Sequence, residues 1–363
     1  MHRRAFLALC ALTGCVGYQG PPSDDTDPEP ALSLPVPEED LVRAANRDAL
    51  PAITEPAFSR DWSGVSLTTR TEFGVREINP RLATFDRVIG LVVDGEPRAY
   101  PLRVLDWHEI VNDDLLVTFC PLCGSAVVAD REIDGRKLTF GVTGLLHQDN
   151  LVMYDAETDS LWSQLHAVAI RGPLTGTRLT LRPSSLTTWR EWREAHPDTV
   201  VLLPPPFSRT VVGRGSVALR DYTDFPYGGY VTSDRVGLSD REPEGPLHPK
   251  TEVLGFASGG EAVAYPRPVV EREEIITDRV GETAVLVTVA DGALRAFDPR
   301  VGGRVPRFSV DGEVLRADGS RWSPRTGEAL DGPHAGTTLD PLPAVVAFWF
   351  AWHDAHPETR IYG

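Results

Sequence analysis

The sequence predicts a β-rich α+β fold with two internally duplicated halves, each mostly antiparallel strands with one C-terminal helix. Short apolar runs are separated by the turn signals Asp94-Gly95 and Asp134-Gly135, which are typical of β-hairpins. Trp189 and Trp192 follow these runs at helical spacing, and Pro197 is expected to end that helix.

The motifs of the first half recur in the same order in the second half. The clearest matches are Ala99-Tyr100-Pro101 with Ala264-Tyr265-Pro266, Trp162-Ser163 with Trp322-Ser323, and Trp189-x-x-Trp192-x-x-x-His196-Pro197 with Trp349-x-x-Trp352-x-x-x-His356-Pro357. Because so many ordered matches are improbable by chance, we expect both halves to share a fold.

The expected elements follow in order along the chain. The first half should contain a helix over 38–48, strands at 88–93, 98–102, 115–119, 126–129, 138–142 and 200–203, and one helix after the capping residues 183–188. The second half should repeat this pattern from Val253, with a helix near 344–354 and a last strand reaching Ile361.

Residues 1–15 are interpreted as a twin-arginine lipoprotein signal. Arg3-Arg4 precedes a short apolar run, and Leu12-Thr13-Gly14-Cys15 resembles a lipoprotein signal box. This resemblance implies lipidation of Cys15 and an extracytoplasmic protein anchored by lipid to the outer face of the cell membrane. An ordinary cleaved signal or an uncleaved anchor is the alternative. Residues 16–37, rich in Pro, Asp and Ser, are expected to form a disordered tether.

The remaining chain divides into a first half (38–205), a connecting strap (206–250) and a degenerate second half (251–363). The strap is aromatic and turn-rich, so it either packs over both halves or forms a lid or wall of a pocket.

The formal charge is -16, from 52 acidic and 36 basic residues. Only Lys137 and Lys250 are lysines. This balance argues against nucleic acid or an anionic membrane surface as a partner. We interpret the carboxylate excess as a solvated, halophilic surface, so it is weak support for any catalytic acid.

The pair Cys120-Pro121-Leu122-Cys123 marks the expected site. The interval from Thr118 to Phe140 is 22 residues, whereas the matching interval from Thr288 to Phe308 is 20 and contains no cysteine. His108 is matched by Glu273, and the segment around His147 is absent from the second half. The two halves therefore differ at the sulfur and imidazole positions.

Three kinds of chemistry fit the pair. Cys120, Cys123 and His108, with His147 as a fourth ligand, would suit a zinc or copper site, with Asp106, Glu109 and Asp149 orienting an imidazole. A redox dithiol is the second interpretation, because an exported protein meets an oxidising compartment. Gly124-Ser125-Ala126 continues as a strand, which argues against a thioredoxin-like site. A small structural disulfide is the third interpretation.

Several polar residues of the first half have no match in the second. Asn150, Gln164 and Asp155 are the candidate substrate-binding residues, either lining a pocket or serving turns and core. The sequence assigns no catalytic residue.

Much of the chain closely resembles one protein family. The runs that carry the resemblance are Trp107-His108-Glu109-Ile110-Val111-Asn112-Asp113, Thr118-Phe119-Cys120-Pro121-Leu122-Cys123-Gly124-Ser125-Ala126, Asn150-Leu151-Val152-Met153-Tyr154-Asp155 and Ser160-Leu161-Trp162-Ser163-Gln164. They resemble the family catalogued as domain of unknown function 3179, uncharacterised exported proteins of bacteria and archaea. The resemblance implies the cysteine pair and the Trp-His-Glu run, and it implies no activity.

Two function hypotheses result. The first is a surface-anchored metal-dependent or redox enzyme acting through Cys120 and Cys123. The second is a non-catalytic envelope lipoprotein that binds a small solute or another protein and holds a structural disulfide. The substrate, the metal and the redox state of the pair are open at this point.

Overall fold

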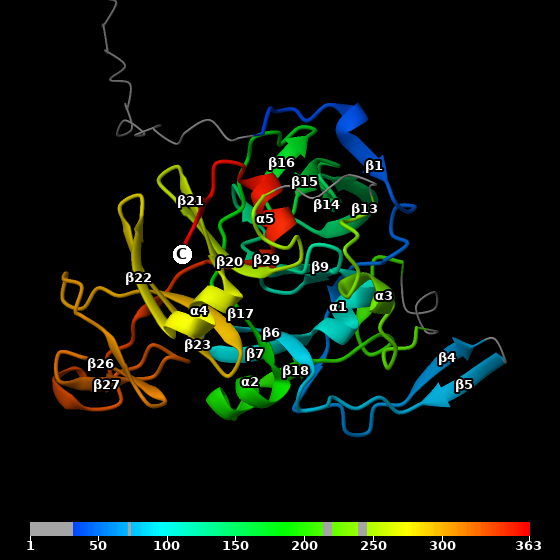
Figure 1. The fold of residues 1–363 in the computed structure, drawn as a ribbon. Coiled ribbons are helices and arrows are strands. Elements are labelled where there is room, and N and C mark those ends of the chain that lie inside the picture. Colours follow the sequence, from blue (N-terminus) through cyan, green and yellow to red (C-terminus); the bar gives the residue numbers. More distant parts are fainter. Residues whose placement is uncertain (1–31, 72–73, 213–219, 239–244) are drawn as a thin grey trace, which may run out of the picture.

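The computed structural model describes residues 32–71, 74–212, 220–238 and 245–363, and it shows a β-rich α+β fold (Figure 1). This confirms the predicted fold class. Residues 1–31, with the predicted signal and the lipidated Cys15, lie outside the described residues. Of the predicted tether, Leu32 and Val36 are buried, and the Val36 N–H donates to the Ile170 carbonyl at 3.0 Å.

The largest sheet runs through both halves. Its order is β19 (Arg209–Thr210), β2 (Ile53–Glu55), β8 (Ile110–Asn112), β9 (Leu116–Cys120), β10 (Ser125–Ala129), β29 (Val345–Phe348), β20 (Glu252–Ser258), β21 (Glu261–Pro266) and β30 (Arg360–Ile361). The halves join where β10 pairs with β29 through Ala126 and Val346. An apolar core with members from both halves, such as Ile89 and Leu254, lies beneath.

The other sheets belong to one half each. The first half contains β17 (Ser185–Thr188), β6 (Arg87–Val93), β7 (Glu96–Pro101), β18 (Val200–Leu202) and β3 (Phe58–Ser59) in one sheet, and β1 (Leu41–Arg43), β13 (Phe140–His147), β14 (Asn150–Asp155), β15 (Leu161–Ser163) and β16 (Val168–Arg171) in another. The second half contains β22 (Ile275–Val280), β23 (Thr283–Ala290), β24 (Ala293–Asp298) and β28 (Asp340–Pro341), and also β25 (Ser309–Asp311), β26 (Val314–Ala317) and β27 (Ser320–Trp322). Two hairpins, β4 (Leu67–Thr71) with β5 (Gly74–Ile78) and β11 (Glu132–Ile133) with β12 (Arg136–Lys137), complete the strands.

The helices are short. They are α1 (Leu102–His108), α2 (Trp189–Ala195), α3 (Gly228–Val231), α4 (Arg267–Glu273) and α5 (Trp349–Ala355), with 3-10 turns at Glu38–Asp40 and Gly332–His334. Thr188 and Glu191 form a capping box at the start of α2, as the capping residues predicted. Within the described chain, every helix is too short or too polar to cross a bilayer.

Two element predictions were wrong. The helix expected over 38–48 is a single 3-10 turn followed by β1, because Leu41 to Arg43 pair with β13 instead. Each half also contains a second helix: α1 lies between the β6–β7 hairpin and β8, and α4 lies between the β20–β21 hairpin and β22. Neither helix shows a clear periodic stripe, since each is only seven residues long.

Equivalent contacts occur in both halves. The Tyr100 hydroxyl donates to Asp113 and the Tyr265 hydroxyl to Asp278. The Trp192 indole donates to Thr199 at 2.8 Å, and the Trp352 indole donates to Thr359 at 2.9 Å. We propose, on these parallels, that the two halves arose by duplication.

Candidate functional site

The cysteine loop, residues 120–124, joins β9 to β10. The Cys123 N–H donates to the Cys120 carbonyl at 3.2 Å, and the Phe348 N–H donates to the Cys123 carbonyl at 2.8 Å. Gly124 has φ of 57°, and a Cβ on it would lie 3.0 Å from the Phe348 ring. The loop therefore depends on a glycine and leads into a strand, unlike the helix of a thioredoxin site.

Both cysteines are free and buried, with exposed fractions of 1% for Cys120 and 0% for Cys123. The two thiols are hydrogen-bonded to each other, and the Cys123 thiol also lies 3.3 Å from the Asp149 carbonyl oxygen. The structure thus holds the pair as two free thiols in hydrogen-bond contact.

The surroundings shift the pKa values of the two thiols in opposite directions. Burial opposes ionisation of Cys120, but hydrogen bonds from the Cys123 thiol and from the backbone N–H groups of Cys123, Leu151 and Leu122 lower its pKa below the usual value. Burial and the neighbouring Cys120 sulfur raise the pKa of Cys123 well above that value. Cys120 is therefore the thiol that ionises first.

Two buried carboxyl groups lie near Cys120. Glu109 follows α1, and its backbone carbonyl accepts from the Phe119 N–H at 2.8 Å, next to Cys120. Burial raises the pKa of Glu109 well above its usual range, and Cys120 and Asp106 raise it further. Burial also raises the pKa of Asp106 to about 7. Among the described residues, Asp106 Oδ1 has no hydrogen-bond partner.

A buried polar network supports the loop from below. Asn150 and Ser125 donate to Gln164 Oε1 at 2.9 and 2.7 Å, and Gln164 Nε2 donates to Thr118 at 3.1 Å. The Asn150 amide also hydrogen-bonds Cys123. The structure thus brings Asn150 and Gln164 beside the cysteines, where their amides hold the loop in place instead of lining the cavity described below.

Asp155 lies at the opposite end of β14 from Asn150. Its carboxylate accepts from Thr158 and, at 2.9 Å, from the Trp162 indole. Asp155 therefore organises a turn and a core tryptophan and is not part of the cysteine site.

The structure does not assemble the expected metal ligands. His108 is fully buried, and its ring nitrogens bond the Pro51 carbonyl at 2.7 Å and the Tyr222 hydroxyl at 2.8 Å. Burial lowers the pKa of His108 to about 4. Both imidazole nitrogens are thus engaged away from the thiols.

His147 ends β13 and lies near other histidines instead. Its ring centroid is 6.4 Å from that of His166, which in turn is 6.2 Å from that of His356. In the described part of the chain, no group of three or more His, Cys, Asp or Glu side chains is arranged to hold a metal ion. The donor set therefore does not fit the predicted zinc site, which needs four ligands or three and an open position.

The connecting strap covers the cysteine loop. Tyr222 stacks against His108, and α3 lies beside α1 (Figure 1). The Tyr230 hydroxyl donates to the Leu122 carbonyl and accepts from the Gly237 N–H, both at 2.8 Å. Lys250 donates to the Tyr230 and Ser233 carbonyls and lies over the Tyr230 ring. The described part of the strap therefore forms one wall of the site.

A cavity of about 350 Å³ lies next to the loop. Phe119, Pro121 and Gly124 line it, together with Asp106 and Phe348. Two ion pairs, Arg103 with Asp86 and Arg87 with Glu252, lie at its margin. Phe119 and Pro121 are the chain neighbours of Cys120, and Gly124 follows Cys123. A substrate bound in the cavity would therefore contact residues next to both cysteines.

Sequence reasoning gave Glu109 and Asp106 only a supporting role beside an imidazole. The sequence could not predict the burial of these two carboxyl groups. Glu274 occupies the matching position to Glu109 in the second half and is exposed, so the shared motif does not determine burial. The strap is predicted to be aromatic, yet residue spacing alone could not show that Tyr222 and Tyr230 contact His108 and the cysteine loop.

The family model described as "Protein of unknown function (DUF3179)" matches residues 47–359. The chain belongs to the DUF3179 family. The match covers nearly the whole chain, including both halves and the strap, so the cysteine loop of this DUF3179 protein lies inside the family region. No curated protein and no solved structure matches the chain.

Proposed function

We propose that this DUF3179 protein is an exported, lipid-anchored thiol–disulfide oxidoreductase in which Cys120 and Cys123 form the redox pair. The observation that carries the proposal is the reduced, hydrogen-bonded pair whose two pKa values are moved in opposite directions. A stabilised thiolate next to a protonated thiol is the arrangement that exchange with a disulfide requires.

The first step uses Cys120 as the nucleophile. Its thiolate attacks one sulfur of a substrate disulfide, forms a mixed disulfide and releases the other sulfur as a thiolate. Burial raises the pKa of Glu109 well above its usual range and favours its protonated form, so we propose its carboxyl group as the proton donor to that leaving thiolate.

The second step uses Cys123. Once Cys120 is in a mixed disulfide, its negative charge no longer raises the pKa of Cys123. The Cys123 sulfur attacks Cys120, its proton leaves with the second substrate sulfur as a thiol, and Cys120 and Cys123 close as a disulfide. The substrate disulfide is reduced by two electrons, and the pair is oxidised by two. The reverse sequence oxidises a substrate dithiol.

Trapping of the mixed disulfide tests this proposal. Protein purified without an affinity tag is treated with glutathione disulfide and analysed by intact-mass spectrometry. We expect Cys123→Ser to accumulate one glutathione on Cys120, Cys120→Ser to accumulate none, and the parent chain to pass to an internal disulfide. An adduct on Cys123 alone, or none in any variant, would contradict it.

Metal analysis of the same preparation is the control for the metal hypothesis. The chain offers two sulfurs and no third ligand among the described residues, so we expect less than stoichiometric zinc or copper. One bound metal ion per chain, lost in the variant lacking both cysteines, would favour the metal interpretation over the redox one.

A further inference from the structure

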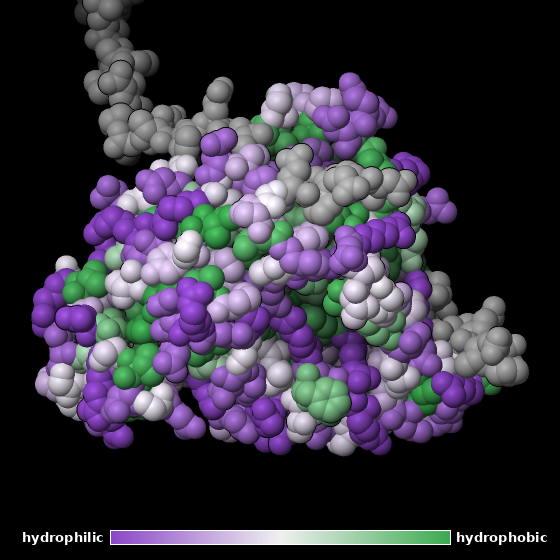
Figure 2. Space-filling model, viewed as in Figure 1, coloured by the Kyte–Doolittle hydropathy of each residue, from purple (hydrophilic) through white to green (hydrophobic). Residues whose placement is uncertain are grey.

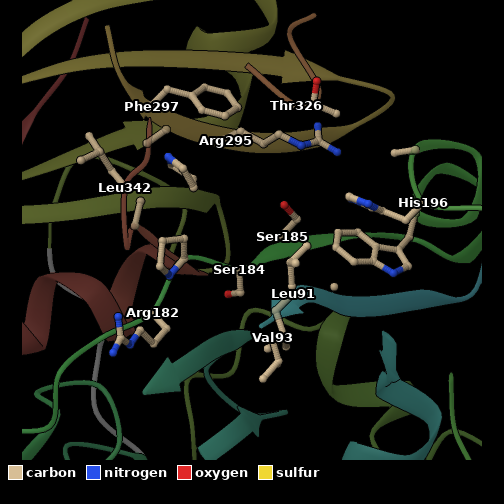
Figure 3. Close-up of a pocket in the computed structure, with 18 of the residues that line it drawn as sticks. Leu91, Val93, Arg182, Ser184, Ser185, His196, Arg295, Phe297, Thr326 and Leu342 are labelled. Atoms are coloured by element: carbon tan, nitrogen blue, oxygen red, sulfur yellow. The ribbon is translucent and has the colours of Figure 1, made fainter. Parts of the chain in front are cut away.

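A second cavity, of about 630 Å³, lies between the two halves (Figure 3). On one side of the molecule β10 pairs with β29, but on the other side β17 and β24 lie beside each other without a bridge among the described residues. The cavity occupies this opening, between Ser185 of β17 and Arg295 of β24. Leu115 and Asp130, at the end of the β9–β10 hairpin remote from the cysteines, also line it.

Arg295 is the unusual residue of this cavity. Its exposed fraction is 9%, and its Nη1 donates to the carbonyls of Ala290 and Ala293 at 3.0 and 3.3 Å. Within the described chain it forms no ion pair, because the nearby Asp291 pairs with Arg325. Burial lowers its pKa to about 10, so the guanidinium is still charged at neutral pH. Asp291 and Glu191 act on this charge only from beyond ion-pair distance, so a buried guanidinium here would gain from an anion in direct contact with it.

The scaffold does not require a charge at this position. Arg295 pairs with Thr288 in the β23–β24 hairpin, whereas Val127 pairs with Thr118 in the β9–β10 hairpin. Thr118 and Thr288 occupy equivalent places in the two halves, so Arg295 stands where the first half has a buried valine. The arginine is therefore specific to the half that borders the cavity.

The cavity has a polar end and an apolar end. The Arg295 guanidinium extends toward Thr326, His196 and Ser185, while Phe297 and Leu342 lie on the opposite side (Figure 3). The Ser185 hydroxyl bonds to no described residue, so it is available as a donor. A planar guanidinium favours a carboxylate, which it can bind through two parallel hydrogen bonds.

We infer that this cavity is a binding site for a small organic carboxylate, whose anionic group pairs with Arg295 and whose hydrocarbon part lies toward Phe297 and Leu342. The site is separate from the cysteine loop and does not depend on the redox proposal.

Calorimetric titration of the mature chain with hexanoate, hexanamide and sulfate tests the inference. We expect saturable binding of hexanoate, with hexanamide and sulfate at least about tenfold weaker, since one lacks the charge and the other the apolar part. Arg295→Gln should weaken hexanoate at least about tenfold, and the exposed-arginine control Arg279→Gln should leave it unchanged. Hexanamide or sulfate binding as tightly as hexanoate, or no binding at all, would overturn the inference.

A second measurement keeps the test decisive if Arg295→Gln loses affinity through misfolding. Because Arg295 is a buried charge with no carboxylate in direct contact, Arg295→Gln should melt at the same temperature as the ligand-free parent or higher, and hexanoate should raise the melting temperature of the parent only. A variant that melts lower than the parent and still responds to hexanoate would assign Arg295 a structural role instead.

Discussion

Hydrogen-bond donors surround the Cys120 sulfur. Three backbone N–H groups and the Cys123 thiol stabilise its thiolate, while burial opposes it. Glu109 would repel that thiolate if it were ionised, and burial raises the Glu109 pKa, which favours the neutral carboxyl group. A protonated Glu109 therefore keeps a proton close to the Cys120 sulfur.

The pH dependence of alkylation tests the order of ionisation. The rate of iodoacetamide modification of Cys120 should rise with a midpoint below the pKa of an ordinary cysteine thiol. Cys123→Ala removes one hydrogen bond to the thiolate, so its midpoint should move upward. In the Cys120→Ala variant, the Cys120 charge no longer raises the pKa of Cys123, so Cys123 should react at a lower pH than it does in the parent, although burial still opposes its ionisation. Equal midpoints for the two cysteines would contradict the assignment.

Asp106 makes the stability of the protein depend on pH. Its carboxyl pKa is about 7 in the folded state and near 3.8 when unfolded, so the unfolded state loses its proton first. The free energy of unfolding should therefore fall as the pH rises from about 4 to about 7. Asp106→Asn removes this term and should be more stable than the parent at pH 8, by at most about 4 kcal/mol.

Urea unfolding at several pH values measures that difference. The gain of Asp106→Asn should vanish below pH 4, where the parent carboxyl is protonated in both states. A gain that is the same at pH 4 and pH 8 would show that the carboxyl does not ionise as described.

At the scale of elements, the strap controls access to the thiols. Tyr230 fixes it to the cysteine loop through Leu122, and the Leu238 N–H donates to the Asp149 carboxylate at 2.9 Å. The backbone carbonyl of Asp149 also accepts from the Cys123 thiol, so Asp149 contacts both the strap and the thiol. Opening of the strap is therefore expected to expose the pair.

Tyr230→Phe tests this coupling. Loss of the hydroxyl leaves the Leu122 carbonyl and the Gly237 N–H without their shared partner, which should cost about 1–2 kcal/mol of stability. Native-state alkylation of Cys120 should become faster. Tyr227→Phe is the matched control, because the Tyr227 hydroxyl bonds to no described residue. If both variants alkylate at the parent rate, the strap does not gate the site.

At the scale of the whole molecule, both halves share one sheet and one core. Gly90 and Gly255 occupy equivalent places, and a Cβ on either would lie 2.2 or 2.3 Å from the ring of Trp192 or Trp352. Charged and polar residues cover most of the visible surface, as the net charge of -16 implies (Figure 2).

Paired alanine substitutions test whether the halves unfold together. Gly90→Ala and Gly255→Ala should each destabilise the protein by about 1–3 kcal/mol through overpacking. Each should lower the midpoint of one shared calorimetric transition, because β10 and β29 join the halves. Gly229→Ala, where a Cβ would meet open space, is the control. Two separate transitions, each moved by one variant, would contradict a single cooperative unit.

Short-range sequence signals predicted the elements that are formed by residues close together in the chain. The turns, the tryptophan helices and the cysteine loop followed from residues close together in the chain. The helix predicted over 38–48 does not form, because Leu41–Arg43 pair with β13, which lies about 100 residues away in the chain and overrides local helix preference. The sequence also could not predict the hydrogen bonds of the His108 imidazole, because its partners Pro51 and Tyr222 are remote in sequence. The raised pKa of Glu109 could not be foreseen, because it results from burial.

The redox titration of Cys120 and Cys123 tests the central claim most directly. The protein is equilibrated across a series of dithiothreitol ratios, trapped with a thiol-alkylating reagent and weighed by mass spectrometry. The account predicts one reversible two-electron transition in which both thiols disappear together, absent from Cys120→Ser and from Cys123→Ser. Thiols that stay reduced across the whole series, or a disulfide that no ratio reduces in the folded protein, would contradict it.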